Sequence, residues 1–139
     1  MKTKIWEQTI SGTSIAAGAT QWFNGNPMRF SRPSGRFVVI QARVKVISRG
    51  GQNLLVKVWG QDSVIWPAES AYQAGFQGWN AQLIGTEATV TTDNFLLPPK
   101  LAKDYVPAVG LRGAISVQNL GGAAASPQIE VEFWVNEEN

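Results

Sequence analysis

Four runs of the sequence alternate apolar and polar residues with a period of two: residues 37–47, 54–59, 109–118 and 128–135. Successive side chains of a β-strand point to opposite faces, so this pattern is typical of strands that bury one face and expose the other. Connections rich in Gly, Asn, Ser and Pro bound these runs. The pattern predicts an all-β fold, a two-sheet antiparallel sandwich or single jelly roll. The length of 139 residues predicts one domain over residues 1–139.

Two of the connections suggest how these strands pair. The segment "SRGGQN" between the first two runs contains two glycines, which favour the positive backbone angles of a hairpin turn. The small-residue segment "NLGGAAASP" joins the last two runs. We therefore expect two hairpins. Arg43, Lys45 and Lys57 would share the outer face of the first hairpin, and acidic residues would line the outer face of the last strand.

The stretch "WPAESAYQAGFQGWNAQLIG", residues 66–85, interrupts the strand pattern. Pro67 suits the first position of a helix, and Tyr72 and Phe76 have the spacing of one helical face. Two glycines that follow disfavour a continuous helix. We expect one long aromatic loop that contains a short helix near residues 67–74.

The composition excludes several kinds of active site. The chain has no cysteine, so it can form no disulfide, thiolate nucleophile or cysteine-based metal site. It has no histidine, the usual general base near neutral pH and the commonest metal ligand. Phosphate-binding and hydrolase motifs are missing from the sequence as well. We expect a protein that is not an enzyme, with no catalytic residue, no bound metal and no cofactor.

The first part of the chain, "MKTKIWEQTISGTSIAAGAT", contains two lysines but no continuous apolar segment of the length that a secretory signal needs. No stretch of the sequence approaches the apolar run of about 18 residues that suggests a membrane span. We expect a protein that is made in the cytoplasm without a signal peptide and that does not span a membrane.

Charge is distributed unevenly along the chain, although the formal net charge is only +2. Residues 1–60 contain nine basic residues and one acidic residue, whereas residues 61–139 contain three basic and nine acidic residues. A sandwich that interleaves strands from both halves would mix these charges in space. The other interpretation is a molecule with one basic and one acidic side, which would attract nucleic acid or other copies of itself.

The basic side would be centred on the first predicted hairpin. The candidate interaction residues are Arg43, Lys45, Arg49 and Lys57, together with Glu130 and Glu132 on the last predicted strand. The basic residues could bind either of two partners: the phosphate backbone of nucleic acid, in a contact without sequence specificity, or the acidic residues of a neighbouring subunit. An ordinary solvated surface is the third interpretation.

Aromatic residues gather in and before the predicted loop, among Gln, Asn and Asp residues. They are Trp59, Trp66, Tyr72, Phe76 and Trp79. Aromatic faces stack on sugar rings while amides and carboxylates bind the hydroxyl groups, so this composition fits a carbohydrate-binding platform. Contact with another subunit is a second interpretation, because Trp and Tyr concentrate at interface centres. Anchoring of the loop on the sheet is a third.

Stretches such as "SGTSIAAGAT" and "NLGGAAASPQIEVEFWV", with the basic first half, resemble small structural proteins of bacteriophage virions, of the single jelly-roll coat or cement type. The resemblance is one of composition over the whole chain. It implies a virion location and self-assembly into symmetric homo-oligomers, trimers or pentamers, with further contacts to other virion proteins. A carbohydrate-binding module or lectin that uses the aromatic loop is the alternative function.

Overall fold

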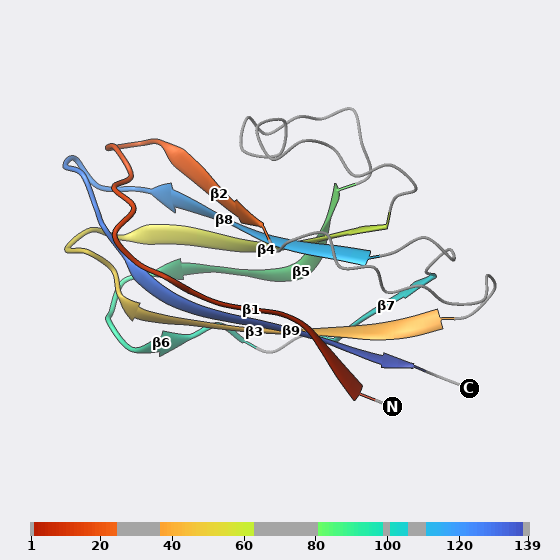
Figure 1. Cartoon of the computed structure of the whole chain (residues 1–139). Coiled ribbons are helices and arrows are strands. Elements are labelled where there is room, and N and C mark those ends of the chain that lie inside the picture. The colour runs from red at the N-terminus through yellow and green to blue at the C-terminus, as the bar shows by residue number, and fades with distance from the viewer. Residues whose placement is uncertain (1, 25–36, 63–80, 99–100, 106–110, 138–139) are drawn as a thin grey trace.

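The alternating runs form β-strands in a computed structural model of the chain, which describes residues 2–24, 37–62, 81–98, 101–105 and 111–137 (Figure 1). The strands are β1 (Lys2–Ile10), β2 (Thr20–Asn24), β3 (Phe37–Ser48), β4 (Leu54–Asp62), β5 (Ala81–Val90), β6 (Phe95–Leu96), β7 (Leu101–Tyr105), β8 (Leu111–Asn119) and β9 (Gln128–Glu137). All regular elements of the described residues are strands, and they form two antiparallel sheets. The prediction of an all-β sandwich is therefore confirmed. The predicted helix near residues 67–74 lies outside the described residues.

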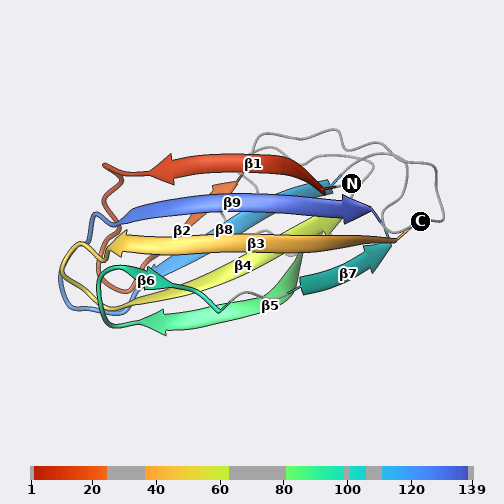
Figure 2. The same ribbon diagram turned by 90° about the horizontal axis from the view of Figure 1, so that it is seen from below.

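The order of the strands in each sheet is that of a single jelly roll. The first sheet has the order β1-β9-β3, and β6 and β7 pair with different parts of the other edge of β3. The second sheet has the order β2-β8-β4-β5. Figure 2 shows the first sheet in front of the second. Chain neighbours mostly lie in opposite sheets, so the two sheets are interleaved along the sequence.

Both predicted hairpins are wrong. β3 and β4 lie in different sheets, and so do β8 and β9. β3 pairs with β9, β6 and β7, whereas β4 pairs with β8 and β5. The connection between β3 and β4 does contain the expected positive φ angles, 69° at Gly50 and 86° at Gly51. It nevertheless leads from one sheet to the other.

The apolar alternation cannot distinguish a hairpin from a crossing between sheets, which explains the error. Two strands of one sheet turn their apolar sides to a common core, and two stacked strands turn theirs toward each other across the same core. Either arrangement buries Val44 of β3 and Val56 of β4, which are 1% and 0% exposed. The actual arrangement places the outward side chains of β3 and β4 on opposite faces of the sandwich.

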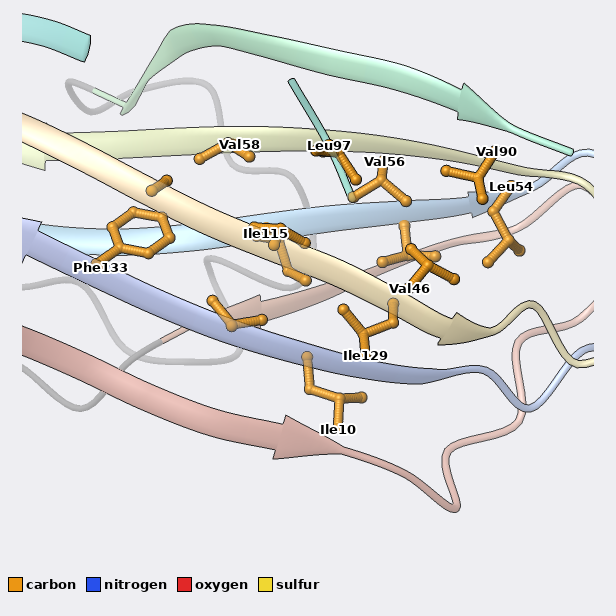
Figure 3. Close-up of a cluster of buried hydrophobic side chains, with 14 of the residues drawn as sticks. Ile10, Val46, Leu54, Val56, Val58, Val90, Leu97, Ile115, Ile129 and Phe133 are labelled. Atoms are coloured by element: carbon orange, nitrogen blue, oxygen red, sulfur yellow. The ribbon is translucent and has the colours of Figure 1, made fainter. Parts of the chain in front are cut away.

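The core lies between the two sheets and consists of the apolar side chains at alternate strand positions (Figure 3). The largest fully buried side chains are Phe133, Ile15, Leu54, Ile115, Ile129, Val44 and Val46. Trp6 of β1 adds a ring whose centroid lies 5.2 Å from that of Phe133. Each such side chain contributes about 1.5–3 kcal/mol on burial, so this layer is the main force that holds the sheets together.

Four connections between strands close one end of the sandwich, at the left in Figure 1, and each of them crosses from one sheet to the other. We call this end the loop cap; it consists of residues 11–19, 49–53, 91–94 and 120–127. Ile15 and Ala125 exchange backbone hydrogen bonds of 2.7 and 3.0 Å. The backbone N–H of Leu120 donates to the carbonyl oxygen of Asn53 at 2.9 Å. Hydrogen bonds thus join neighbouring connections across the cap.

Asn119, the last residue of β8, ties the loop cap to the sheet. Its side chain is buried, and its Nδ2 donates to the carbonyl oxygens of Ile15 at 3.0 Å and Ala123 at 2.7 Å. Its Oδ1 accepts a hydrogen bond of 2.9 Å from the backbone N–H of Gly121. A buried amide whose donors and acceptor are satisfied fixes the conformation of the loops around it.

Candidate functional site

The outer face of the first sheet carries charged side chains of both signs. Arg43 of β3 lies opposite Glu132 of β9 in the strand register, and its Nη1 lies 3.3 Å from Glu132 Oε1. Lys4 of β1 places its Nζ 3.0 Å from Glu7 Oε2 and 3.8 Å from Glu132 Oε2. Exposed pairs of this kind contribute about 0 to 1 kcal/mol each, so this cluster affects surface potential more than stability.

The same register places Lys45 directly opposite Glu130. Arg43 and Lys45 were predicted to attract Glu130 or Glu132 of another subunit. Within one chain, however, Arg43 and Lys45 on β3 already lie beside Glu130 and Glu132 on β9. Of the two interpretations of the uneven charge, mixing in space describes this face. The reason is that the last strand, from the acidic half of the chain, pairs with strands from the basic half.

Lys57 does not share the face of Arg43 and Lys45, so the predicted common basic face is wrong. Lys57 lies on β4 in the second sheet, between two buried valines, and its Nζ is 4.0 Å from Glu87 Oε2. Arg49 lies in the loop cap. Arg43, Lys45, Arg49 and Lys57 therefore do not form one continuous basic surface of the kind that a nucleic acid backbone would need. A role of these residues in binding stays a prediction.

Arg49 is held by two hydrogen-bond acceptors in the loop cap. Its Nε and its backbone N–H donate to Asp93 Oδ1 at 3.3 and 3.0 Å, and its Nη1 donates to Asn53 Oδ1 at 2.8 Å. The hydrogen bond from the backbone N–H of Arg49 is the main cause that lowers the pKa of Asp93. Desolvation opposes this shift, whereas the hydrogen bond and the positive charge of the Arg49 guanidinium lower the pKa further. Arg49 therefore has a structural role that the sequence did not suggest.

The outer face of the second sheet carries an aromatic pair. Trp59 of β4 points away from the core, and its indole Nε1 donates to the hydroxyl of Ser116 on β8 at 2.9 Å. The ring of Trp22 on β2 lies beside it, with ring centroids 5.1 Å apart and an angle of 43° between the planes. We call Trp22, Trp59 and Ser116 the tryptophan platform. Both rings are half-buried.

The register of three strands explains why the two rings meet. β8 lies between β2 and β4, with Ser116 opposite Trp22 and Ala114 opposite Trp59. The outward residues of β8 at this point are small, so the two indoles reach over β8 from either side. Ser116 and Ala114 are consequently only 4% and 0% exposed, although they lie on the outer side of the sheet.

The platform overlaps only in part with the predicted aromatic cluster. Trp59 belongs to both, whereas Trp66, Tyr72, Phe76 and Trp79 lie outside the described residues. Trp22 and Ser116 were not predicted. They are far from Trp59 in sequence, and only the pairing of β2 and β4 with β8 brings them together.

Polar side chains surround the platform. Thr20 of β2 lies opposite Gln118 of β8, two residues along the strands from the Trp22 and Ser116 pair. Thr89 of β5 is exposed on the same face, and Lys57 and Glu87 form the ion pair described above. The described part of this face thus offers aromatic surface together with hydroxyl, amide and charged groups.

Two kinds of site are not formed by the part of the chain that the structure describes. These residues contain no group of three or more Asp, Glu, His or Cys side chains that could hold a metal ion. They also contain no helix long and apolar enough to cross a membrane.

No protein-family model matches the sequence, and no curated protein matches it significantly. Similar solved structures include the Yersinia pseudotuberculosis-derived mitogen, with 12% identity, a TM-score of 0.49, and coverage of 96% of this chain and 88% of that one. A capsid protein of tomato aspermy virus has 12% identity, a TM-score of 0.44, and coverage of 100% and 78%. The carbohydrate-binding module TmCBM61, in complex with β-1,4-galactotriose, has 12% identity, a TM-score of 0.41, and coverage of 99% and 88%. At these identities the likeness concerns the fold alone.

Proposed function

We propose that this chain is a structural subunit of a virion, a coat or decoration protein that self-assembles into symmetric oligomers and acts by binding, not by catalysis. Single jelly rolls are typical of viral coat proteins but also of lectins, so the fold by itself does not decide between them. The proposal depends on the loop cap, whose surface has the properties of a subunit contact.

The two long edge strands that the structure describes are poorly suited to assembly by strand addition. β1 and β5 are the long edge strands of the described sheets. The ladder between β1 and β9 shifts between Lys4 and Trp6, and the ladder between β4 and β5 shifts between Lys57 and Trp59. Such irregularities twist an edge and hinder the addition of further strands. Subunits would therefore meet through loops or faces, which favours closed assemblies over fibres.

The exposed side chain of Leu120 is the observation that carries the proposal. Leu120 is 46% exposed in the loop cap, and its backbone N–H is hydrogen-bonded to Asn53. The only charged residues of the cap are Arg49 and Asp93, which pair with each other. An apolar side chain on a hydrogen-bonded, charge-poor surface suits the core of an interface, because charged residues are depleted there and a fixed loop loses little entropy on binding.

Two leucine variants test this proposal. Leu120→Glu should weaken self-association by at least about tenfold, because a buried interface side chain is replaced by a charge. Leu96→Glu is the matched control, since Leu96 is 47% exposed but lies on β6 at the face of the first sheet. Light scattering over a range of concentrations gives the mass relative to the protomer of 15.1 kDa. A wild-type monomer at every concentration, or equal effects of the two variants, would overturn the proposal.

A further inference from the structure

We propose that the outer face of the second sheet is a carbohydrate-binding site, in which the rings of Trp22 and Trp59 stack on consecutive sugar rings of a neutral oligosaccharide. This inference does not depend on assembly through the loop cap, because the two surfaces are formed by different residues. It differs in part from the sequence-based expectation, which placed a sugar site on Trp59, Trp66, Tyr72, Phe76 and Trp79: only Trp59 is common to both, and the partner ring is now Trp22.

The tryptophan platform is fixed in position before any ligand binds. The hydrogen bond from Trp59 Nε1 to Ser116 Oγ holds one ring, and the neighbouring ring of Trp22 packs beside it above β8. Tryptophan has only two side-chain torsions, so a ring held in this way loses little conformational entropy when it contacts a ligand. Trp22 and Trp59 are both partly exposed residues.

The angle between the rings favours a sugar chain over a flat ligand. A planar base or aromatic ring cannot stack on both indoles at once, because their planes differ by 43°. Consecutive sugar residues of an oligosaccharide are rotated relative to each other, so each can lie against a differently inclined ring. The 5.1 Å between the ring centroids is comparable to the length of one sugar residue.

The polar groups beside the rings favour a neutral ligand with many hydroxyl groups. Thr20, Gln118 and Thr89 supply uncharged donors and acceptors on the outer face of the sheet. The charged residues Lys57 and Glu87 lie within 4.0 Å of each other, so their charges largely cancel. This ion pair therefore adds no excess charge of either sign beside the rings.

The test uses a panel of neutral oligosaccharides of glucose, xylose, mannose, galactose and N-acetylglucosamine, with binding measured by titration calorimetry. We expect saturable binding to at least one of them. Trp22→Ala and Trp59→Ala should each weaken that binding by about tenfold or more, as expected for an aromatic contact at the centre of a site. Trp134→Ala is the matched control, because Trp134 is half-buried on β9 in the other sheet, where Lys4 Nζ lies 5.2 Å from its ring centroid. It should leave affinity within about twofold, since peripheral substitutions have small effects.

A second variant guards against loss of folding. Trp59 covers Ser116 and Ala114, so Trp59→Ala could lower stability as well as affinity. Trp59→Phe keeps a ring over these residues but offers a smaller stacking surface and lacks the indole N–H. We expect Trp59→Phe to show a cooperative thermal unfolding transition like that of the wild type and to bind the oligosaccharide several-fold more weakly. Failure of the whole panel to bind, or binding that is unchanged in Trp59→Phe and Trp22→Ala, would overturn the inference. A fall in oligomer mass in Trp59→Ala without any sugar binding would assign the rings to a subunit contact instead.

Discussion

Asn119→Ala should destabilise the fold more than any substitution of a comparable polar residue on the outer faces. The substitution removes two donated hydrogen bonds, to the carbonyl oxygens of Ile15 and Ala123, and one accepted from the N–H of Gly121. All three partners belong to the loop cap. Because Asn119 is 0% exposed, the alanine leaves a small void where the amide was.

The magnitude follows from the partners that remain. A typical hydrogen bond contributes about 0.5–1.5 kcal/mol net, and an unsatisfied buried group costs somewhat more. The carbonyl oxygen of Ile15 keeps its bond from the N–H of Ala125, and Ala123 is exposed, so water can replace part of the loss. We therefore expect a decrease of about 2 kcal/mol in the free energy of unfolding, or a decrease of about 7 °C in Tm for a domain of this size.

Urea unfolding followed by far-UV circular dichroism measures this change. Gln118→Ala is the control, because Gln118 is the half-buried neighbour on the outer face and its loss should change stability by at most about 0.5 kcal/mol. Asn119→Asp keeps the acceptor for Gly121 but turns a carboxylate toward two carbonyl oxygens, so it should be at least as destabilising at neutral pH. If Asn119→Ala costs no more than Gln118→Ala, the buried amide does not hold the loop cap together, and the reasoning fails.

Two further predictions concern the loop cap. Gly50→Ala should destabilise clearly more than Gly51→Ala: both residues have positive φ, which costs about 1–2 kcal/mol for other residues, but a Cβ at Gly50 would lie 2.5 Å from the backbone nitrogen of Ser126, whereas a Cβ at Gly51 meets nothing within 4 Å. If urea unfolding shows that both variants lose the same free energy of unfolding, the close approach between Gly50 and the backbone of Ser126 is contradicted. Asp93→Asn should lower the free energy of unfolding at neutral pH, and this difference from wild type should disappear in acid. The pKa of Asp93 is lowered in the folded state, so its stabilisation is present above its ordinary value of 3.8 and disappears as the pH falls through the lowered value. A difference between wild type and variant that persists at the acid end of the pH series would contradict this assignment.

The four alternating runs correctly predicted β3, β4, β8 and β9 but not which strands pair, and the predicted loop wrongly included residues 81–85, which belong to β5. Alternation reports which face of a strand is buried, and it correctly predicted the burial of Val44, Val56 and Ile129. Pairing depends on contacts between residues far apart in sequence, and it leaves no local signal. β2, β6 and β7 were not predicted because each has five residues or fewer, which is too short for a clear alternation, and the segment between β6 and β7 contains two prolines that cannot donate to a ladder.

The same limit applies to the candidate sites. The charged residues were identified from composition, but their grouping followed the wrong hairpin, so Lys57 was assigned to the face of Arg43. Trp22 was not connected with Trp59 because the two are related only through β8. One local signal was available: two outward positions of a strand, Ala114 and Ser116, are small, which suggests that larger side chains from neighbouring strands cover them.

The interleaved strand order also determines when the chain can fold during synthesis. β9 lies between β1 and β3, and β8 lies between β2 and β4, yet β8 and β9 come last of all the strands. A nascent chain that has emerged only as far as β7 therefore lacks the central strand of each sheet. β1 and β2 then have no neighbour to pair with, and their apolar faces stay uncovered on the ribosome. We expect folding to begin only after the last strands leave the exit tunnel, and to be slow, because nearly every ladder joins distant segments of the chain.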